Sequence, residues 1–132
     1  IKNTNYYLIP NRFNDGYGPN LDLIKKNLKK NTKIVIFVDC GSNSKEIVNF
    51  LKKNNIEVLI IDHHHINNKL ASTLNIINPM KNPKDYMGQN ICAAALTFYL
   101  IDLLNNRLKK KINIYDFFCD LLFCKILTIY FI

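Results

Sequence analysis

The sequence predicts an α/β fold in which a mostly parallel sheet carries helices on both faces. Two short apolar runs, Ile34–Val38 and Val58–Ile61, are rich in β-branched residues, and an acid follows each of them. Such runs are typical of buried parallel strands, and the amphipathic stretch between them has the length of a βαβ crossover. With 132 residues, of which 48% are hydrophobic, the chain can form one domain or part of one.

Turn-forming residues divide the segment that precedes these strands. Tyr6–Ile9 is expected to be a short strand that stops at Pro10. The stretch 11–20 contains two glycines and a proline, which predicts a loop. Leu21–Lys30 places apolar side chains among lysines at helical spacing, so an amphipathic helix should follow the loop.

The crossover helix is expected to begin at a serine, because Ser42 or Ser44 can cap it with a side-chain oxygen. Its buried stripe is expected to comprise Ile47, Val48, Phe50 and Leu51. Asn54-Asn55 should end this helix, and Ile56–Ile61 should form the next strand.

The second half of the chain predicts one further strand and one further helix. Leu74–Ile77 is expected to be a short strand, Ile91–Leu104 a long apolar helix and Arg107–Lys111 a basic connector. Charged residues interrupt Ile112–Ile132, so it lacks the roughly 20 apolar residues that a membrane span needs. Within it, Ile126–Ile132 resembles a strand and would be aggregation-prone if it stayed unpaired.

Charge and cysteine content narrow the class of protein. The net charge of +8 favours a polyanionic partner, although a lysine- and asparagine-rich composition can also reflect coding bias. None of the four cysteines forms a C-x-x-C pair, so buried free thiols in a reducing cytosol are favoured over a zinc site or disulfides. The chain begins with isoleucine and shows no secretory signal, so we expect a fragment or a processed chain.

Two acids and a histidine pair form the candidate site. Asp39 closes one predicted strand, and Asp62-His63-His64 follows the next, so they should meet at the carboxyl edge of the sheet, where adjacent strands lie about 4.8 Å apart. A carboxylate there can bridge two divalent ions and an imidazole can hold one of them. The chemistry leaves a second interpretation open, in which the acids cap turns and the histidines lie in a solvated loop.

The backbone after Asp39 favours an anion. Gly41 would let the chain come close to a phosphate group. The backbone N–H groups of Asn43 and Ser44 would open the following helix, and helix N-termini attract phosphate.

Taken in order, three segments resemble successive motifs of the DHH phosphoesterase superfamily. They are Val38-Asp39-Cys40-Gly41, Ile60-Ile61-Asp62-His63-His64 and Ile76-Ile77-Asn78-Pro79. Within the superfamily the chain is most similar to the RecJ family of single-strand-specific 5′→3′ DNA exonucleases. That likeness rests on Ile9-Pro10-Asn11-Arg12-Phe13 with Gly16-Tyr17-Gly18, and on Gly88 with the helix from Ala93 to Leu100.

The resemblance implies a role for each matching residue. Asp39 would bridge two Mn²⁺ or Mg²⁺ ions, and His63 would bind one of them. His64 would face the scissile phosphate as a catalytic residue, and Asp62 would orient the histidine pair. Arg12, Gly16, Tyr17 and Gly18 would help to place the DNA backbone, and Gly41 remains a substrate-binding residue on the ground given above, its close approach to a phosphate. His65 has no role in the family and is expected to be a loop residue.

The chain departs from the family pattern at both ends. The first metal motif would lie before residue 1, and the aspartate of the fourth would fall near Ile129 or Phe131, where this chain is apolar. We therefore expect residues 1–111 to form a partial DHH domain that lacks the first metal motif, and 112–132 a divergent tail. The accessory domain that binds nucleic acid in the family is also missing.

These features predict a fragment of a cytoplasmic, metal-dependent exonuclease that is inactive on its own. Its partners would be single-stranded DNA and replication or repair proteins, with no membrane involved. Basic residues along a groove and stacked aromatics would provide the affinity for single strands. Two alternatives remain: another DHH phosphoesterase, acting on an oligonucleotide, a cyclic dinucleotide or pyrophosphate, or a catalytically dead remnant that binds a partner.

Overall fold

A computed structural model describes residues 5–11, 13–16, 18–67, 75–81, 91–109, 112–113 and 128–131, the last four through their backbone alone. In this part of the chain the strands are β1 (Tyr6–Leu8), β2 (Ile34–Val38), β3 (Glu57–Ile61), β4 (Ile76–Ile77) and β5 (Thr128–Phe131). The helices are α1 (Leu21–Asn27), α2 (Lys45–Lys53) and α4 (Ala93–Arg107), with a short 3₁₀ turn, η1, at Pro79–Lys81.

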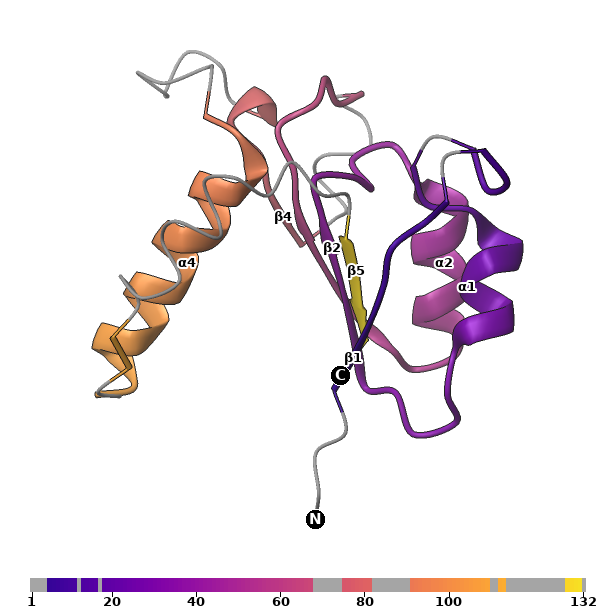
Figure 1. Cartoon of the computed structure of the whole chain (residues 1–132), viewed down its shortest axis with the longest axis horizontal. Coiled ribbons are helices and arrows are strands. Elements are labelled where there is room, and N and C mark those ends of the chain that lie inside the picture. Colours follow the sequence, from indigo (N-terminus) through magenta and orange to yellow (C-terminus); the bar gives the residue numbers. More distant parts are fainter. Residues whose placement is uncertain are drawn as a thin grey trace.

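The strands form one sheet in the order β1-β5-β2-β3-β4. Strands β2, β3 and β4 are parallel, and Val38 at the end of β2 lies opposite Ile61 at the end of β3. Strand β5 is antiparallel to both of its neighbours, so the sheet is mixed on one side. Helices α1 and α2 cover one face and α4 lies on the other (Figure 1). The predicted α/β class, with helices on both faces, is confirmed.

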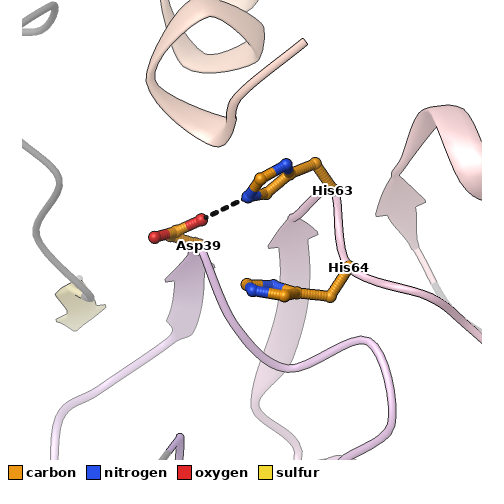
Figure 2. A group of neighbouring side chains, drawn as sticks. All are labelled: Asp39, His63 and His64. Atoms are coloured by element: carbon orange, nitrogen blue, oxygen red, sulfur yellow. Dashed lines mark ion pairs between the residues drawn. The ribbon is translucent and has the colours of Figure 1, made fainter. Parts of the chain in front are cut away.

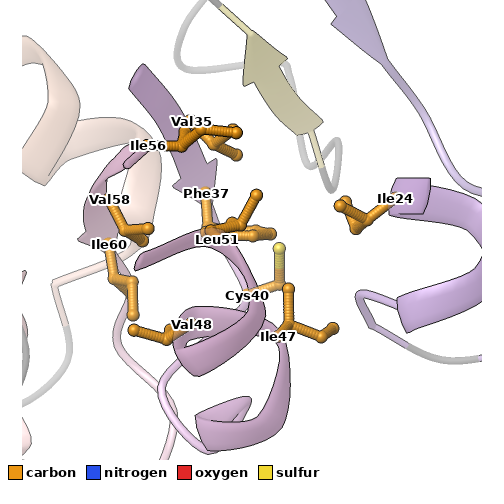
Figure 3. Close-up of a cluster of buried hydrophobic side chains, with 10 residues drawn as sticks. All are labelled: Ile24, Val35, Phe37, Cys40, Ile47, Val48, Leu51, Ile56, Val58 and Ile60. Atoms are coloured by element: carbon orange, nitrogen blue, oxygen red, sulfur yellow. The ribbon is translucent and has the colours of Figure 1, made fainter. Parts of the chain in front are cut away.

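The hydrophobic core lies between the central strands and the first two helices. Alternate residues of β2 and β3 point to this side, because successive side chains of a strand face opposite ways. Figure 3 shows the cluster, formed by Ile24, Val35, Phe37, Cys40, Ile47, Val48, Leu51, Ile56, Val58 and Ile60. Fully burying one large aliphatic side chain contributes about 1.5–3 kcal/mol, so this cluster is the main source of stability for β2, β3 and α2. Phe50, predicted to lie in the stripe, is only partly buried beside it.

Two helices differ from the predicted boundaries for identifiable reasons. Helix α1 ends at Asn27 because Leu28 adopts an extended backbone. The amide of Lys29 then donates a hydrogen bond of 3.0 Å to the Tyr6 hydroxyl, which ties the chain to β1. Helix α4 runs from Ala93 to Arg107, so it starts and ends later than predicted and takes in the first residue of the expected basic connector.

The predicted side-chain cap of α2 is wrong. Ser44 occupies the N-cap position, but its hydroxyl makes no capping hydrogen bond. Its carbonyl accepts the Val48 amide at 3.0 Å, so the backbone alone starts the helix. Ser42 does not cap the helix either, because its side chain is buried among polar groups at the sheet edge.

Strand β5 gives the end of the chain a place inside the sheet. Its backbone pairs with β1 on one side and β2 on the other, so the strand-like run is not left unpaired. Ile129 lies opposite Phe37, and Phe131 lies opposite Val35, so neither lies at the end of the sheet where Asp39 follows Val38. Residues 114–127 and 132 of the predicted tail lie outside the described residues, as does Leu74 of the predicted fourth strand.

None of the helices in the described ranges combines the length and apolarity that crossing a bilayer requires.

We predict that Leu51→Ala destabilises the chain by about 2–5 kcal/mol, because Leu51 is fully buried at the centre of the cluster and its removal leaves a cavity. The free energy of unfolding in urea measures this. Leu103→Ala on α4 is the matched control, since Leu103 is 54% exposed and should change stability by less than about 0.5 kcal/mol. Equal losses for the two variants would show that the core lies elsewhere.

Candidate metal centre

Asp39 is the first residue beyond β2, and its backbone turns sharply there. Its φ angle is +62°, a left-handed conformation that aspartate and asparagine tolerate better than most residues. The Asp39 amide donates a hydrogen bond of 2.9 Å to the carbonyl of Ile61, which continues the pairing between β2 and β3. This bond fixes the turn, and the turn presents the carboxylate at the carboxyl edge of the sheet.

The histidine pair meets Asp39 from the neighbouring strand end. His63 Nε2 lies 3.0 Å from an Asp39 carboxylate oxygen, and both rings point toward Asp39 in Figure 2. One ligand atom from each of Asp39, His63 and His64 lies within 4.8 Å of the others. The side chains are partly exposed, at 25% for Asp39, 32% for His63 and 59% for His64. The predicted convergence of Asp39 and His63 at neighbouring parallel strand ends is confirmed.

Asp62 lies beneath this group and is only 1% exposed. One of its carboxylate oxygens accepts the amide of His63 at 2.8 Å, and the same oxygen lies 2.7 Å from His64 Nδ1. The other oxygen accepts the amide of Ser42 at 3.1 Å. Both oxygens are therefore engaged within the protein, which suits a residue that orients the histidines rather than one that binds an ion.

The pKa of Asp62 reflects two opposing effects. Burial alone would raise it, because a desolvated carboxylate loses hydration energy. Hydrogen bonds from the Ser42 hydroxyl, from the His64 ring and from the backbone amides of Ser42 and His63 favour the charged form, and together they hold the pKa below its ordinary value of 3.8. Asp62 is therefore ionised at neutral pH and can only accept hydrogen bonds. The contact of 2.7 Å between Asp62 and His64 Nδ1 then requires a proton on Nδ1, which leaves Nε2 as the free nitrogen of a neutral His64 ring.

Close packing requires a glycine at position 41, in addition to any need for a ligand to approach the backbone there. Its φ angle is +100°, and an added Cβ would lie 3.1 Å from Cβ of Phe37. The predicted anion site at the start of α2 is corrected in part, because the amide of Ser44 already donates to the carbonyl of Gly41 at 3.0 Å. Asn43 instead uses its side chain, which donates to the carbonyl of His65 and accepts the amide of Asn67.

The predicted DNA-contacting loop is described only in part. Gly16 and Gly18 adopt φ angles of +79° and +86°, with open space where a Cβ would be. Both glycines lie within the loop that the sequence predicts, outside any helix or strand. Arg12, Tyr17 and the family-like Gly88 lie outside the described residues.

The cysteines divide into two kinds. Cys40 is buried, and desolvation, followed by the nearby charges of Asp62 and Asp39, raises its pKa to about 12. Cys92 is free but exposed, so the prediction of a buried thiol is wrong there. Cys119 and Cys124 lie outside the described residues.

Sequence reasoning missed two residues that complete the site. Asn78, which follows β4, is 4% exposed, and its side-chain amide donates to Ser42 Oγ at 2.8 Å and to the carbonyl of His64 at 2.9 Å. The sequence indicates Ser42 only as a possible helix cap, and it indicates Asn78 only as part of a family-like segment with no role of its own. One sequence signal could have identified Asn78. It is a polar residue directly after a third predicted parallel strand, and the carboxyl ends of parallel strands meet at the same edge of the sheet.

The donor set fits a divalent metal ion. Carboxylate oxygen together with imidazole nitrogen suits Mn²⁺, and Mg²⁺ accepts the oxygen ligands. His64 Nε2 remains available because Asp62 engages Nδ1 of the same ring. Within the residues that the structure describes, Asp39, His63 and His64 are the one group of at least three such side chains that converges this closely.

Comparison with known proteins gives consistent matches. Residues 1–125 match the DHH family, N-terminal domain. The chain is 33% identical over 95 residues to the single-stranded-DNA-specific exonuclease RecJ of Haemophilus influenzae, which covers 72% of this chain and 16% of that protein. It is 29% identical to the Escherichia coli exonuclease of the same name over 105 residues, covering 80% and 18%, and 26% identical to that of Bacillus subtilis over 106 residues, covering 80% and 14%. The chain thus spans less than a fifth of the length of each relative. No solved structure gave a significant match.

We predict that iodoacetamide modifies Cys92 in the folded chain and leaves Cys40 unmodified. A pKa raised from 9.0 to about 12 lowers the thiolate fraction of Cys40 about a thousandfold at pH 8, and burial blocks the reagent as well. Peptide mapping by mass spectrometry after timed labelling measures both sites. In urea the two should react at similar rates, and similar rates without urea would contradict the buried position of Cys40.

We also predict that acid destabilises the metal-free chain through Asp62. Its pKa is lower in the folded state than in the unfolded state, so its stabilising contribution is complete above about pH 4 and is lost as the pH falls below that value. Urea unfolding with EDTA between pH 7 and pH 3 should show a smaller acid-dependent loss for Asp62→Asn than for wild type. Glu57→Gln, which alters an exposed carboxylate on β3, is the control and should follow the wild-type curve. A wild-type slope in Asp62→Asn would contradict the prediction.

Proposed function

This chain belongs to the DHH family, and from that premise we propose that it is a fragment of a metal-dependent exonuclease that degrades single-stranded DNA from the 5′ end. The observation that carries the proposal is the convergence of Asp39, His63 and His64 at one sheet edge. The identity of 26–33% to exonucleases named RecJ supports the choice of substrate. The chemistry is hydrolysis of a phosphodiester bond.

The proposed roles follow from where each side chain lies. The Asp39 carboxylate and His63 Nε2, whose nearest atoms lie 3.0 Å apart, would hold Mn²⁺ or Mg²⁺. The Asp39 carboxylate would take the bridging position that the family resemblance implies. His64 would direct Nε2 at the scissile phosphate, and Asp62 would keep its ring in place. When bound, the divalent ions would lower the pKa of a water molecule and offset charge on the phosphate oxygens.

We also propose that the isolated chain has no exonuclease activity. A two-metal site needs enough carboxylates to offset two divalent charges, and Asp39 is the one carboxylate in the converging group of the described residues. Asp62 is engaged by the backbone and by His64, so it is poorly placed to add a ligand. We place the remaining acids of the family's first metal motif outside residues 1–132. The chain alone should then bind Mn²⁺ weakly and show no appreciable exonuclease activity.

Contacts with DNA form a further part of the proposal. Arg12, Gly16, Tyr17 and Gly18 would contact the DNA backbone, and Gly41 would lie at the reacting phosphate. The net charge of +8 would favour this polyanionic partner. Replication or repair proteins would be the protein partners, the compartment would be the cytoplasm, and no membrane would be involved.

The test compares the chain with a longer protein that carries both missing acidic motifs, on a 3′-labelled single strand with Mn²⁺. The longer protein should shorten the strand from the 5′ end, and Asp39→Ala or His63→Ala should lower the rate by at least about a thousandfold, since each removes a metal ligand. His65→Ala is the matched control: it alters a neighbouring histidine outside the converging group and should retain activity.

Other outcomes would change the assignment. Cleavage by the 132-residue chain that is lost in Asp39→Ala would overturn its inactivity. Hydrolysis of pyrophosphate or a cyclic dinucleotide by the longer protein, without cleavage of the single strand, would replace the exonuclease with another DHH phosphoesterase. Absence of all these activities in the longer protein would favour a catalytically dead, partner-binding piece.

A further inference from the structure

We propose that Asn78 and Ser42 are positioning residues that act through Asp62 to fix the tautomer and direction of the His64 ring. The inference deepens the proposed function, because it rests on His64 being one of the groups that serve the reaction. Three parallel strand ends contribute: Ser42 follows β2, Asp62 follows β3 and Asn78 follows β4. All three side chains are at least 95% buried, so they form an internal polar network beneath the exposed histidines.

The network begins at Asn78, and both the nitrogen and the oxygen of its carboxamide form hydrogen bonds. Its nitrogen donates to Ser42 Oγ at 2.8 Å and to the carbonyl of His64 at 2.9 Å. Its oxygen accepts the amide of Met80 at 2.8 Å, which prevents the carboxamide from flipping. An aspartate at this position would have the same shape but no hydrogen to donate.

Ser42 connects Asn78 to Asp62 through hydrogen bonds. Because its oxygen accepts a hydrogen bond from Asn78, its own proton is free to point at the Asp62 carboxylate, to which the hydroxyl donates. The Ser42 amide donates to the same carboxylate at 3.1 Å. Asp62 is thus held by two donors from one residue and cannot rotate away from His64 without leaving buried polar groups unsatisfied, which is unfavourable.

His64 is held at two points by this network. Asp62 accepts Nδ1–H at 2.7 Å, and Asn78 binds the backbone carbonyl of the same residue. The His64 side chain is otherwise 59% exposed, and an exposed imidazole without such partners would exchange tautomers and ring orientations. The network therefore keeps Nε2 unprotonated in the neutral ring and directed at the open side of the site.

The experiment uses the 132-residue chain with ¹⁵N-labelled histidine and no nucleic acid. Long-range ¹H–¹⁵N correlation spectra report which ring nitrogen of His64 carries the proton, which should be Nδ1 in the wild type. Titration with Mn²⁺ alone, followed by broadening of the His63 and His64 ring signals, gives the metal affinity. The broadening of these ring signals can be followed even when Mn²⁺ binds weakly.

Asn78→Asp should mix the two tautomers of His64. It should also weaken Mn²⁺ binding about 10-fold or more, because the Asp62 carboxylate that the network holds accepts the amide of the proposed metal ligand His63 as well. Asn54→Asp is the matched control. Asn54 also donates from its side-chain amide, to the carbonyl of Phe50 at 2.8 Å, but it lies at the end of α2 outside the network. This control should leave both measurements unchanged.

Ser42→Ala provides the second variant, since it removes one buried oxygen and keeps the backbone amide. If the two residues act in series, the double variant should lose no more affinity than the weaker-binding single variant. If far-UV circular dichroism shows that Asn78→Asp is unfolded, Ser42→Ala decides the question. A folded variant with the wild-type tautomer and an affinity within twofold of wild type would overturn the proposal. These measurements do not involve DNA, so a negative nuclease result would leave them intact.

Discussion

The arrangement of the site depends on one buried carboxylate, that of Asp62. It accepts hydrogen bonds from the turn after β2 and from the two histidines after β3, and through Ser42 it is connected to the residue after β4. A buried anion is unfavourable unless donors surround it, so the sheet edge is stable only when these turns close on Asp62 together. This requirement couples the positions of Ser42, His63 and His64, and it explains how partly exposed histidines keep a defined orientation.

Packing underneath the site supplies the second constraint. Gly41 lies against Phe37, which belongs to the core, and Asp39 holds a left-handed backbone two residues earlier. The turn after β2 is therefore held in place by the contact of Gly41 with Phe37 and by the hydrogen bond from the Asp39 amide to the carbonyl of Ile61. Because the interior is close-packed, a change in Phe37 would move the turn and with it the Asp39 carboxylate.

The sequence predicted the features that depend on local pattern. The runs ending at Val38 and Ile61 indicated parallel strands, and the acids beyond them indicated one shared edge. Features that depend on distant partners were not predictable in this way. Ser42 has the chemistry of a helix cap, and only the buried Asp62, 20 residues later, gives it another role. Asn78 before a proline is typical of a turn, and its function depends on Ser42, 36 residues away. The pairing of β5 with both β1 and β2 likewise has no local signal.

The position of β5 has a consequence for how the chain folds. In the described sheet, β1 joins the other strands only through β5, although about 120 residues separate these two elements. During synthesis, β1 and β2 leave the ribosome long before β5, the strand that pairs with both of them in the described sheet. Pairings of such long sequence separation slow folding, because the entropy of closing the loop must be overcome before the contacts form. The nascent chain should therefore expose one edge of β2 until β5 emerges, and chaperones would have the greatest effect on its yield during that interval.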